Sequence, residues 1–337
     1  MAALHLARAG LSVQIIGRPF KERTRIAETL SPEGRSELAV ARLWDRLPMG
    51  VVVPCPVVVS AWQRAEPTWT SFITNPYGCA WHIDRGRLDT WLVSQAEAAG
   101  ASLVTGIVTR IRRADCYWAL DIRPAEGESW AAKTDFLVLA SGPCGSAAKL
   151  GGRERIDALC LIGGLSEPMA NADDWLLVEA VSNGWWYSAP AMDGRMFAAW
   201  MTDTTLITGK RWREMMSTAL QHAPLTRARM ADPPEAFCVG VVSSALTPCA
   251  GKGWVAVGDA MLARDPISGE GLACALRSAR DGAATILNVL QGDSSAWDAA
   301  SIRGIASIAQ YRKQRAAAYK AAQHRWPAER FWARRLN

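Results

Sequence analysis

Apolar runs and amphipathic stretches alternate along this chain, a pattern typical of an α/β fold. Residues 1–9 are rich in alanine and leucine and are followed by Gly10, so they predict a helix with a glycine after its end. Residues 11–16 predict a buried parallel strand. A helix followed by such a strand is the second half of a strand–helix–strand unit, so we expect a first strand and its turn to lie upstream of Met1.

The next predicted elements extend the same domain. Residues 85–99 predict an amphipathic helix that ends at Gly100. Three alternating runs then predict an antiparallel meander, at 103–111, 116–122 and 129–133. A buried strand is predicted at 136–140, and it ends before Ser141 and Gly142.

The second half of the chain adds a strand-rich region and a helical end. Residues 156–245 hold short strand-like pieces and many aromatic residues, as expected of a sheet-based domain. Residues 254–257 predict a buried strand, and 271–287 predict a long helix of small and apolar residues. No repeat or low-complexity linker interrupts the chain, so we expect two interleaved domains followed by a helical segment at 293–337.

Length and charge add a large core and a basic end to this picture. The chain has 337 residues, of which 50% are hydrophobic, and a net charge of only +6. Many basic residues fall near the end of the chain, where their spacing predicts a solvated helix face; a basic surface for an acidic partner is the alternative. These residues are Arg312, Lys313, Arg315, Lys320, Arg325, Arg330, Arg334 and Arg335.

Several classes of protein are not supported by the sequence. The eight cysteines never fall two or three residues apart, so no zinc or iron–sulfur spacing appears, and we expect a reduced, cytoplasmic protein without a metal. The most apolar run, 51–59, is short and broken by prolines, so no membrane span is expected. No motif predicts nucleic-acid binding, and no triad surrounds the four histidines. His82 is a candidate general base, with a structural histidine as the alternative.

The strongest motif lies between a predicted strand and a predicted helix. It begins with Gly258 and Asp259 and runs through Pro266 and Gly269 to Gly271. A carboxylate at a strand end can accept hydrogen bonds from ribityl hydroxyls. The glycines let backbone N–H groups face the pyrimidine edge of a flavin, where the positive end of the helix stabilises negative charge. The alternative is a capped strand-to-helix turn that binds nothing.

This motif resembles that of the FAD-dependent oxidoreductases of the para-hydroxybenzoate hydroxylase fold, which include aromatic monooxygenases, tryptophan halogenases and geranylgeranyl reductases. Residues 85–92 look like the family's Asp/Arg-x-x-Phe/Leu-Asp helix. Residues 136–142 look like a strand that ends in Ala-Thr-Gly, with Ser141 in place of threonine. Residues 26–32 resemble a Gly-Glu-Ser-Leu-x-Pro segment near the flavin, with alanine in place of glycine.

The resemblance implies an α/β fold in which an FAD-binding Rossmann-like domain, a three-layer unit of a parallel sheet with an antiparallel meander, is interleaved with a mixed-sheet substrate domain and followed by a helical tail. The implied bounds are 1–50, 82–150 and 250–292 for the FAD-binding domain, 51–81 and 151–249 for the substrate domain, and 293–337 for the tail. The implied cofactor contacts are Glu28, Arg85, Ser141, Gly142, Gly258, Asp259, Pro266, Gly269, Gly271 and Leu272.

Two cofactor features of such domains are not found in the numbered chain. The G-x-G-x-x-G loop that holds the FAD pyrophosphate would precede residues 1–9, so we expect it upstream of Met1. An acidic residue that binds the adenosine ribose would end the strand at 11–16, but Gly17, Arg18 and Pro19 follow it.

Two further stretches, 184–190 and 324–335, look most like flavoproteins that hydroxylate a tryptophan of a partner protein during maturation of tryptophylquinone-type cofactors. The candidate substrate pocket is Trp185, Trp186, Tyr187 and Pro190, and a core aromatic cluster is the alternative for each of the three aromatic residues. Tryptophan halogenases carry Trp-x-Trp-x-Ile-Pro at this place, where the present chain has tyrosine for the second tryptophan and alanine for isoleucine. They also need a lysine that no lysine here matches.

The resemblance therefore implies an FAD-dependent monooxygenase with NAD(P)H as electron donor. It would hydroxylate an aromatic small molecule, or a tryptophan of a partner protein, through a flavin hydroperoxide. Because the flavin carries out the oxygen chemistry, no catalytic side chain is predicted. A halogenase or reductase of the same fold is the alternative, and an FAD-free, non-enzymatic remnant is a further one.

Overall fold

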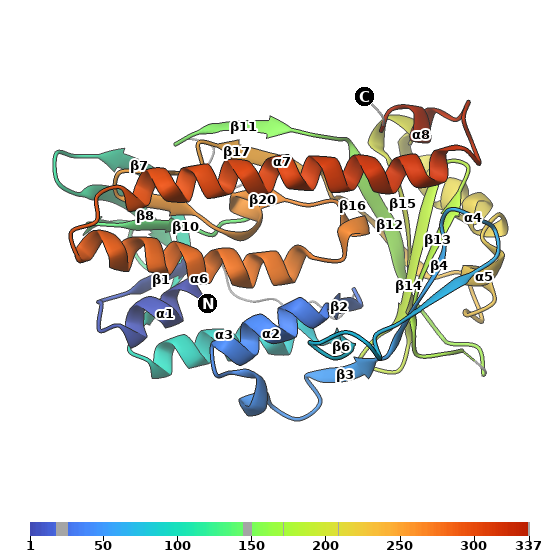
Figure 1. The fold of residues 1–337 in the computed structure, drawn as a ribbon, viewed down its shortest axis with the longest axis horizontal. Helices are drawn as coiled ribbons and strands as arrows, with labels where there is room; N and C mark the ends of the chain where they lie inside the picture. Colours follow the sequence, from blue (N-terminus) through green and yellow to red (C-terminus); the bar gives the residue numbers. More distant parts are fainter. Residues whose placement is uncertain (18–25, 144–149, 171, 208, 336–337) are drawn as a thin grey trace.

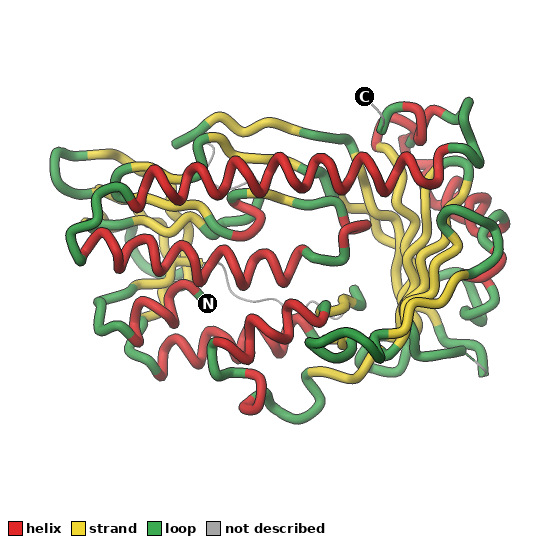
Figure 2. The backbone as a smooth tube through the Cα atoms, in the orientation of Figure 1, coloured by secondary structure: helices red, strands yellow, loops and turns green. Residues whose placement is uncertain are grey.

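The structure, a computed structural model, describes residues 1–17, 26–143, 150–170, 172–207 and 209–335. Helices α1, α2, α3, α6 and most of α7 lie in one half of the elongated molecule, and a large twisted sheet lies in the other half (Figure 1). The helical half also contains strands, as Figure 2 shows. The mixed α/β class predicted from the sequence is therefore confirmed.

The N-terminal elements follow the predicted order. Helix α1 (Ala2–Arg8) is followed by Gly10 with φ of 85° and by strand β1 (Gln14–Gly17). Strand β1 pairs in parallel with β7 (Ser102–Arg113), which continues antiparallel into β8 (Trp118–Pro124) and β9 (Trp130–Thr134). The predicted meander is thus confirmed. Helix α3 (Arg85–Ala98) precedes β7 and is capped by the Asp84 carboxylate.

A second small sheet has three strands. Strand β10 (Leu137–Leu139) pairs in parallel with β19 (Trp254–Ala256), which pairs antiparallel with β18 (Ala250–Gly251). Helix α6 (Gly271–Leu290) follows and packs its apolar face on this sheet. A Cβ atom on Gly282 would lie 2.8 Å from the Val257 side chain, so this glycine lets α6 approach the sheet closely.

The other half of the molecule is built on a seven-stranded sheet with the order β16-β12-β15-β14-β13-β4-β5. Its strands are β4 (Val57–Ala61), β5 (Thr68–Ser71), β12 (Leu159–Ser166), β13 (Leu176–Val181), β14 (Gly184–Pro190), β15 (Met196–Asp203) and β16 (Glu235–Gly240). All neighbours are antiparallel except β13 and β4. One face packs on α4 (Trp212–Gln221) and α5 (Pro224–Arg227), and the other on α7 and α8.

Two three-stranded sheets connect these halves. One contains β2 (Glu28–Leu30), β6 (Ala80–Ile83) and β3 (Val52–Cys55), and helix α2 (Pro32–Val40) follows β2. The other contains β11 (Gly152–Arg155), β17 (Ser244–Thr247) and β20 (Leu262–Ala263). The chain passes between the halves at residues 156–158 and 241–243, which join β11 to β12 and β16 to β17.

Helix α7 (Ala296–Gln323) spans most of the length of the molecule and leads into the short helix α8 (Arg330–Ala333) (Figure 1). The predicted helical segment at 293–337 is confirmed over its described part. The predicted solvated face of this segment was wrong for Arg315 and Arg335, which are drawn into the protein by carboxylates, whereas Arg312 is exposed as predicted. The exact division into two domains stays a prediction.

No helix in the described ranges combines the length and the apolar character needed to cross a membrane.

Candidate cofactor site

The carboxyl ends of β10 and β19 meet at one edge of their sheet. The Val257 amide donates to the Leu139 carbonyl over 3.0 Å, so the residues that follow each strand emerge side by side. After β10 come Ser141 and Gly142, and Gly142 has φ of 73°. After β19 comes Gly258 with φ of 57°, a left-handed conformation that favours glycine. These predicted contacts therefore share one edge of the sheet, which is where ligands of open α/β sheets bind.

An ion-paired cluster lies at the same edge. The Arg85 guanidinium, at the start of α3, forms an ion pair with Glu28 of β2 and a second one with Asp89 at 3.3 Å. These two carboxylates keep the pKa of Arg85 above its ordinary value despite its burial. Arg85 and Glu28, predicted separately as cofactor contacts, are thus brought together.

Asp259 belongs to this cluster by its electrostatics. The surrounding protein raises the pKa of its carboxyl by limiting hydration, and Arg85 opposes that effect. The residue nevertheless keeps contact with solvent at the edge of the sheet. Within the described residues no group donates a hydrogen bond to its carboxylate. A carboxylate in this state is a ready acceptor for hydroxyl groups of a ligand.

The segment from 258 to 271, named here the 258–271 turn, leads from β19 into α6. A short 3-10 helix spans Pro266–Ser268, and Gly269 follows it with φ of 61°. Pro266, Gly269 and Gly271 are exposed. A Cβ atom added to Gly269 or Gly271 would meet no atom within 4 Å. The backbone of the turn therefore faces open space.

The start of α6 leaves donors unused. Among the described residues the backbone N–H groups of Gly271, Leu272 and Ala273 have no acceptor, and no side chain caps the helix. Such groups stabilise negative charge at the positive end of a helix dipole. With the open glycines and the free Asp259 carboxylate, these donors fit the ribityl chain and the pyrimidine edge of a flavin.

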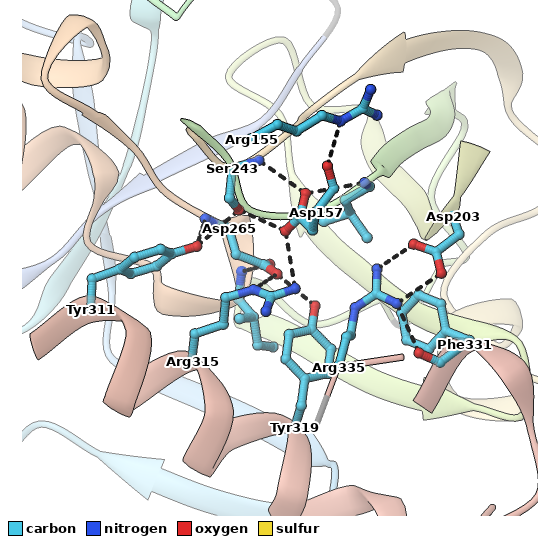
Figure 3. A network of polar contacts seen from close by, with 12 residues as sticks. Arg155, Asp157, Asp203, Ser243, Asp265, Tyr311, Arg315, Tyr319, Phe331 and Arg335 are labelled. Carbon is cyan, nitrogen blue, oxygen red and sulfur yellow. Dashed lines mark hydrogen bonds and ion pairs between the residues drawn. The ribbon is translucent and has the colours of Figure 1, made fainter. Parts of the chain in front are cut away.

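Asp265 holds the turn from behind. It is fully buried, and its carboxylate accepts hydrogen bonds from the Ile267 amide and from the Tyr319 hydroxyl at 2.7 Å. Arg315 forms an ion pair with the same carboxylate at 3.2 Å (Figure 3). The side chains of Tyr319 and Arg315 both project from α7.

The predicted substrate residues of β14 do not share one surface. Trp185 lies on the α7 side of the sheet and donates its Nε1 proton to the Tyr319 hydroxyl over 3.2 Å. Trp186 lies on the opposite side, in the core beneath α4. Both are almost completely buried. Pro190 ends the strand opposite Met196. A role of these residues in substrate binding stays a prediction.

Tyr187 connects the large sheet to the β2–β6–β3 sheet. Its hydroxyl lies 3.2 Å from Thr29 Oγ1, and that oxygen lies 3.4 Å from His82 Nδ1. The other ring nitrogen of His82 lies 2.7 Å from the Asp174 carbonyl, which can only accept, so Nε2 carries the proton. Burial lowers the pKa of His82. The geometry is that of a neutral, satisfied structural histidine.

Some residues around the site were not selected from the sequence. Thr29 lies inside the quoted segment 26–32 but was not predicted as a contact. Tyr311, Arg315 and Tyr319 were missed as a set, although their spacing of four residues places them on one face of a helix. That spacing was the available signal. In the described part of the chain, no group of acidic, histidine or cysteine side chains could hold a metal ion.

No protein-family model matches the chain. LodB of Marinomonas mediterranea, a protein named as an FAD-dependent oxidoreductase, is 25% identical over 270 residues, which cover 77% of this chain and 72% of LodB.

Solved structures of flavoenzymes share the fold. They include the flavin-dependent halogenase CmlS (TM-score 0.88, 22% identity), the peptidyl tryptophan dihydroxylase QhpG (0.80, 23%) and the myxobacterial chondrochloren halogenase CndH (0.84, 21%). Each alignment covers 100% of this chain, which spans 65% of CmlS, 75% of QhpG and 83% of CndH. The predicted resemblance to FAD-dependent enzymes of this fold is therefore confirmed.

Proposed function

We propose that this chain is an FAD-dependent monooxygenase that hydroxylates an aromatic ring, with NAD(P)H as electron donor. The observation that carries the proposal is the 258–271 turn, where free N–H groups, open glycine backbone and an unpartnered carboxylate lie together. The fold shared with flavoenzymes supports FAD as the cofactor. QhpG, whose substrate is a peptidyl tryptophan, makes a tryptophan of a partner protein the favoured substrate.

The residues of the site have distinct tasks in this proposal. FAD, when bound, would supply electron transfer and oxygen activation. The N–H groups of Gly271 and Leu272 would stabilise negative charge on its pyrimidine edge, and Asp259 would accept from ribityl hydroxyls. The Arg85–Glu28 ion pair would fix β2 and α3 beside the cofactor.

The large sheet would provide the dry side of the pocket. Burial raises the pKa of Tyr187 well above its ordinary value, so its hydroxyl stays protonated and can orient a neighbour by hydrogen bonding. Neutral His82 holds Thr29, which holds Tyr187. These groups would position the substrate and exclude water from it. The proposal requires no acid–base pair.

Halogenation is the second candidate, favoured by the high structural similarity to CmlS. Against it stands the placement of the lysines. Every lysine side chain that the structure describes is exposed, namely Lys133, Lys252, Lys313 and Lys320. None of them lies in the buried Tyr187 region.

Gly271→Val tests the cofactor site. Because a Cβ at this position meets no protein atom, the FAD-free variant should melt at the wild-type temperature. The side chain would occupy the space of the flavin, so we expect at least a tenfold loss of FAD affinity, measured by visible absorption during titration. Gly240→Val, on an exposed strand away from the turn, is the matched control. Equal FAD binding by both variants would place the cofactor elsewhere.

The reaction itself is tested with FAD-loaded protein and a panel of aromatic compounds and tryptophan peptides. We expect substrate-stimulated NAD(P)H oxidation and a product that gains one oxygen atom by mass spectrometry. A product that gains halogen or hydrogen would replace the proposal by the halogenase or the reductase. Absence of any stimulated oxidation by the panel in FAD-loaded protein would contradict all three.

A further inference from the structure

Helix α7 is anchored to the 258–271 turn by a connected set of buried polar groups (Figure 3). The Asp265 amide donates to the Tyr311 hydroxyl at 2.8 Å, and that hydroxyl donates to Ser243 Oγ at 2.9 Å. Ser243 Oγ donates to Asp157 Oδ2 at 2.7 Å. Arg315 pairs with both Asp157 (3.1 Å) and Asp265 (3.2 Å). The contacts form a closed ring that includes the crossover segments 156–158 and 241–243.

Tyr319 extends this ring toward the large sheet. Its hydroxyl donates to Asp265 Oδ2 and accepts from Trp185 Nε1. The aromatic side chain of Tyr319 is fully buried among Trp62, Phe331 and Trp332 and cannot move without disturbing that cluster. The hydroxyl is therefore held at a fixed place relative to β14.

Besides Asp265, the exposed part of the turn is held by the ion pair of Arg264 with Glu270 at 3.4 Å. Pro266 and Gly269 face solvent, and Ile267 is its partly buried apolar contact with the core around Tyr319. Asp265 holds the Ile267 amide at 3.1 Å through its other carboxylate oxygen. The position of the backbone at Ile267 thus depends in part on where Asp265 is held.

We propose that Tyr319 and Arg315 of α7 are positioning residues for the cofactor: by fixing Asp265 they set the 258–271 turn at the place that FAD contacts. The inference rests on the proposed function for the identity of the ligand. The fixed turn keeps the N–H groups at the start of α6 aimed outward, so the ligand meets them without reorganisation. Through Trp185, the same hydroxyl ties the turn to a candidate substrate strand.

Tyr319→Phe is the principal test, because it keeps the ring in its aromatic cluster and removes only the hydroxyl. Hydrogen–deuterium exchange is measured on the FAD-free full chain, at the amides of residues 267–270. Loss of one hydrogen bond to a charged acceptor should speed exchange there about tenfold and leave α3 unchanged. Asp265→Asn, which keeps the shape of the side chain, should produce the same regional change.

Arg312→Gln is the matched control on the same helix. Arg312 forms an exposed ion pair with Glu154 outside the ring, so its loss should leave exchange in the turn unchanged. Tyr319→Phe should also weaken FAD binding about tenfold. In the FAD-loaded protein it should shift the midpoint reduction potential of the flavin, because the N–H groups move. Arg312→Gln should change neither quantity.

The outcomes separate the two proposals. Unchanged exchange at 267–270 in both Tyr319→Phe and Asp265→Asn would overturn the positioning role. Equal acceleration in α3 would also overturn it, since the hydroxyl would then serve general stability. Accelerated exchange in the turn, together with no FAD binding by wild-type protein, would support the positioning role and reject the FAD assignment.

Discussion

Burial determines the protonation of side chains around the 258–271 turn. Tyr311 is almost completely buried, and its hydroxyl both accepts from Asp265 and donates to Ser243. Burial, and secondly the charge of Asp265, raises the pKa of Tyr311 from 10.0 to about 12. The hydroxyl is a donor in the fold only while it keeps its proton.

The raised pKa of Tyr311 predicts a loss of stability at high pH. Below pH 10 the phenol is protonated in both the folded and the unfolded chain, so its contribution is complete. Between pH 10 and pH 12 the unfolded chain releases the proton first, and the contribution falls by about 1 kcal/mol at pH 11. Urea unfolding of wild type and Tyr311→Phe at pH 8 and pH 11 should show their difference in unfolding free energy shrink by this amount. A constant difference would contradict the assignment.

Among the secondary-structure elements, α8 is held by a buried ion pair. Arg335 follows α8 and contacts Asp203 at the end of β15 at 2.7 Å, and the two side chains are 2% and 4% exposed. Burying one charge without the other is costly, because the remaining charge loses the hydration that it has in the unfolded chain. The pair therefore specifies where the end of the chain docks.

Arg335→Met should lower the free energy of unfolding by about 3–5 kcal/mol because it leaves Asp203 buried and unpaired. The double variant Arg335→Met/Asp203→Leu should recover much of this loss. Arg334→Met, at the neighbouring exposed arginine, should change stability by less than about 0.5 kcal/mol. Chemical denaturation of the four proteins checks these values, and equal losses in both single arginine variants would refute the pair's importance.

Local elements could be predicted from the sequence because their patterns are local. The helix at 85–99 was confirmed as α3, and the strand at 136–140 as β10, since apolar spacing and a terminal glycine mark each of them. The region 156–245 could not be read in detail. Strand β13 there pairs in parallel with β4, more than 100 residues earlier, and no local pattern encodes such a partner.

The candidate site shows the same limit. The glycines and Asp259 lie in one short motif, so the sequence indicated the 258–271 turn directly. The supports of the turn come from α7, where Arg315 looks like a surface residue until its carboxylate partners are known. Charge partners distant in the chain decide whether an arginine is buried.

On the scale of the whole molecule, α7 unites the two halves. Its first part packs against α6 and β19, and Tyr319 near its end packs in the core of the large sheet. The ring of Asp157, Ser243 and Asp265 links the same parts through polar contacts. Neither half therefore forms a separate packing unit without α7.

We expect thermal unfolding in a single transition despite the two sheets. Tryptophan fluorescence, which reports both halves, and far-ultraviolet circular dichroism should give the same midpoint and the same steepness. Arg312→Gln should retain this coincidence. Two separated transitions would show that α7 does not couple the halves.

The core beneath α7 also has a consequence for synthesis of the protein on the ribosome. It joins Ala27, Trp62, Trp185, Tyr319 and Trp332, which are spread over almost the whole chain. A growing chain can form local helices and hairpins early, but it cannot complete this core until the residues of α8 have emerged. Until that moment the Trp62 and Trp185 side chains lack their final neighbours, so the apolar face of the large sheet stays uncovered from the time its strands form until α8 has been synthesised.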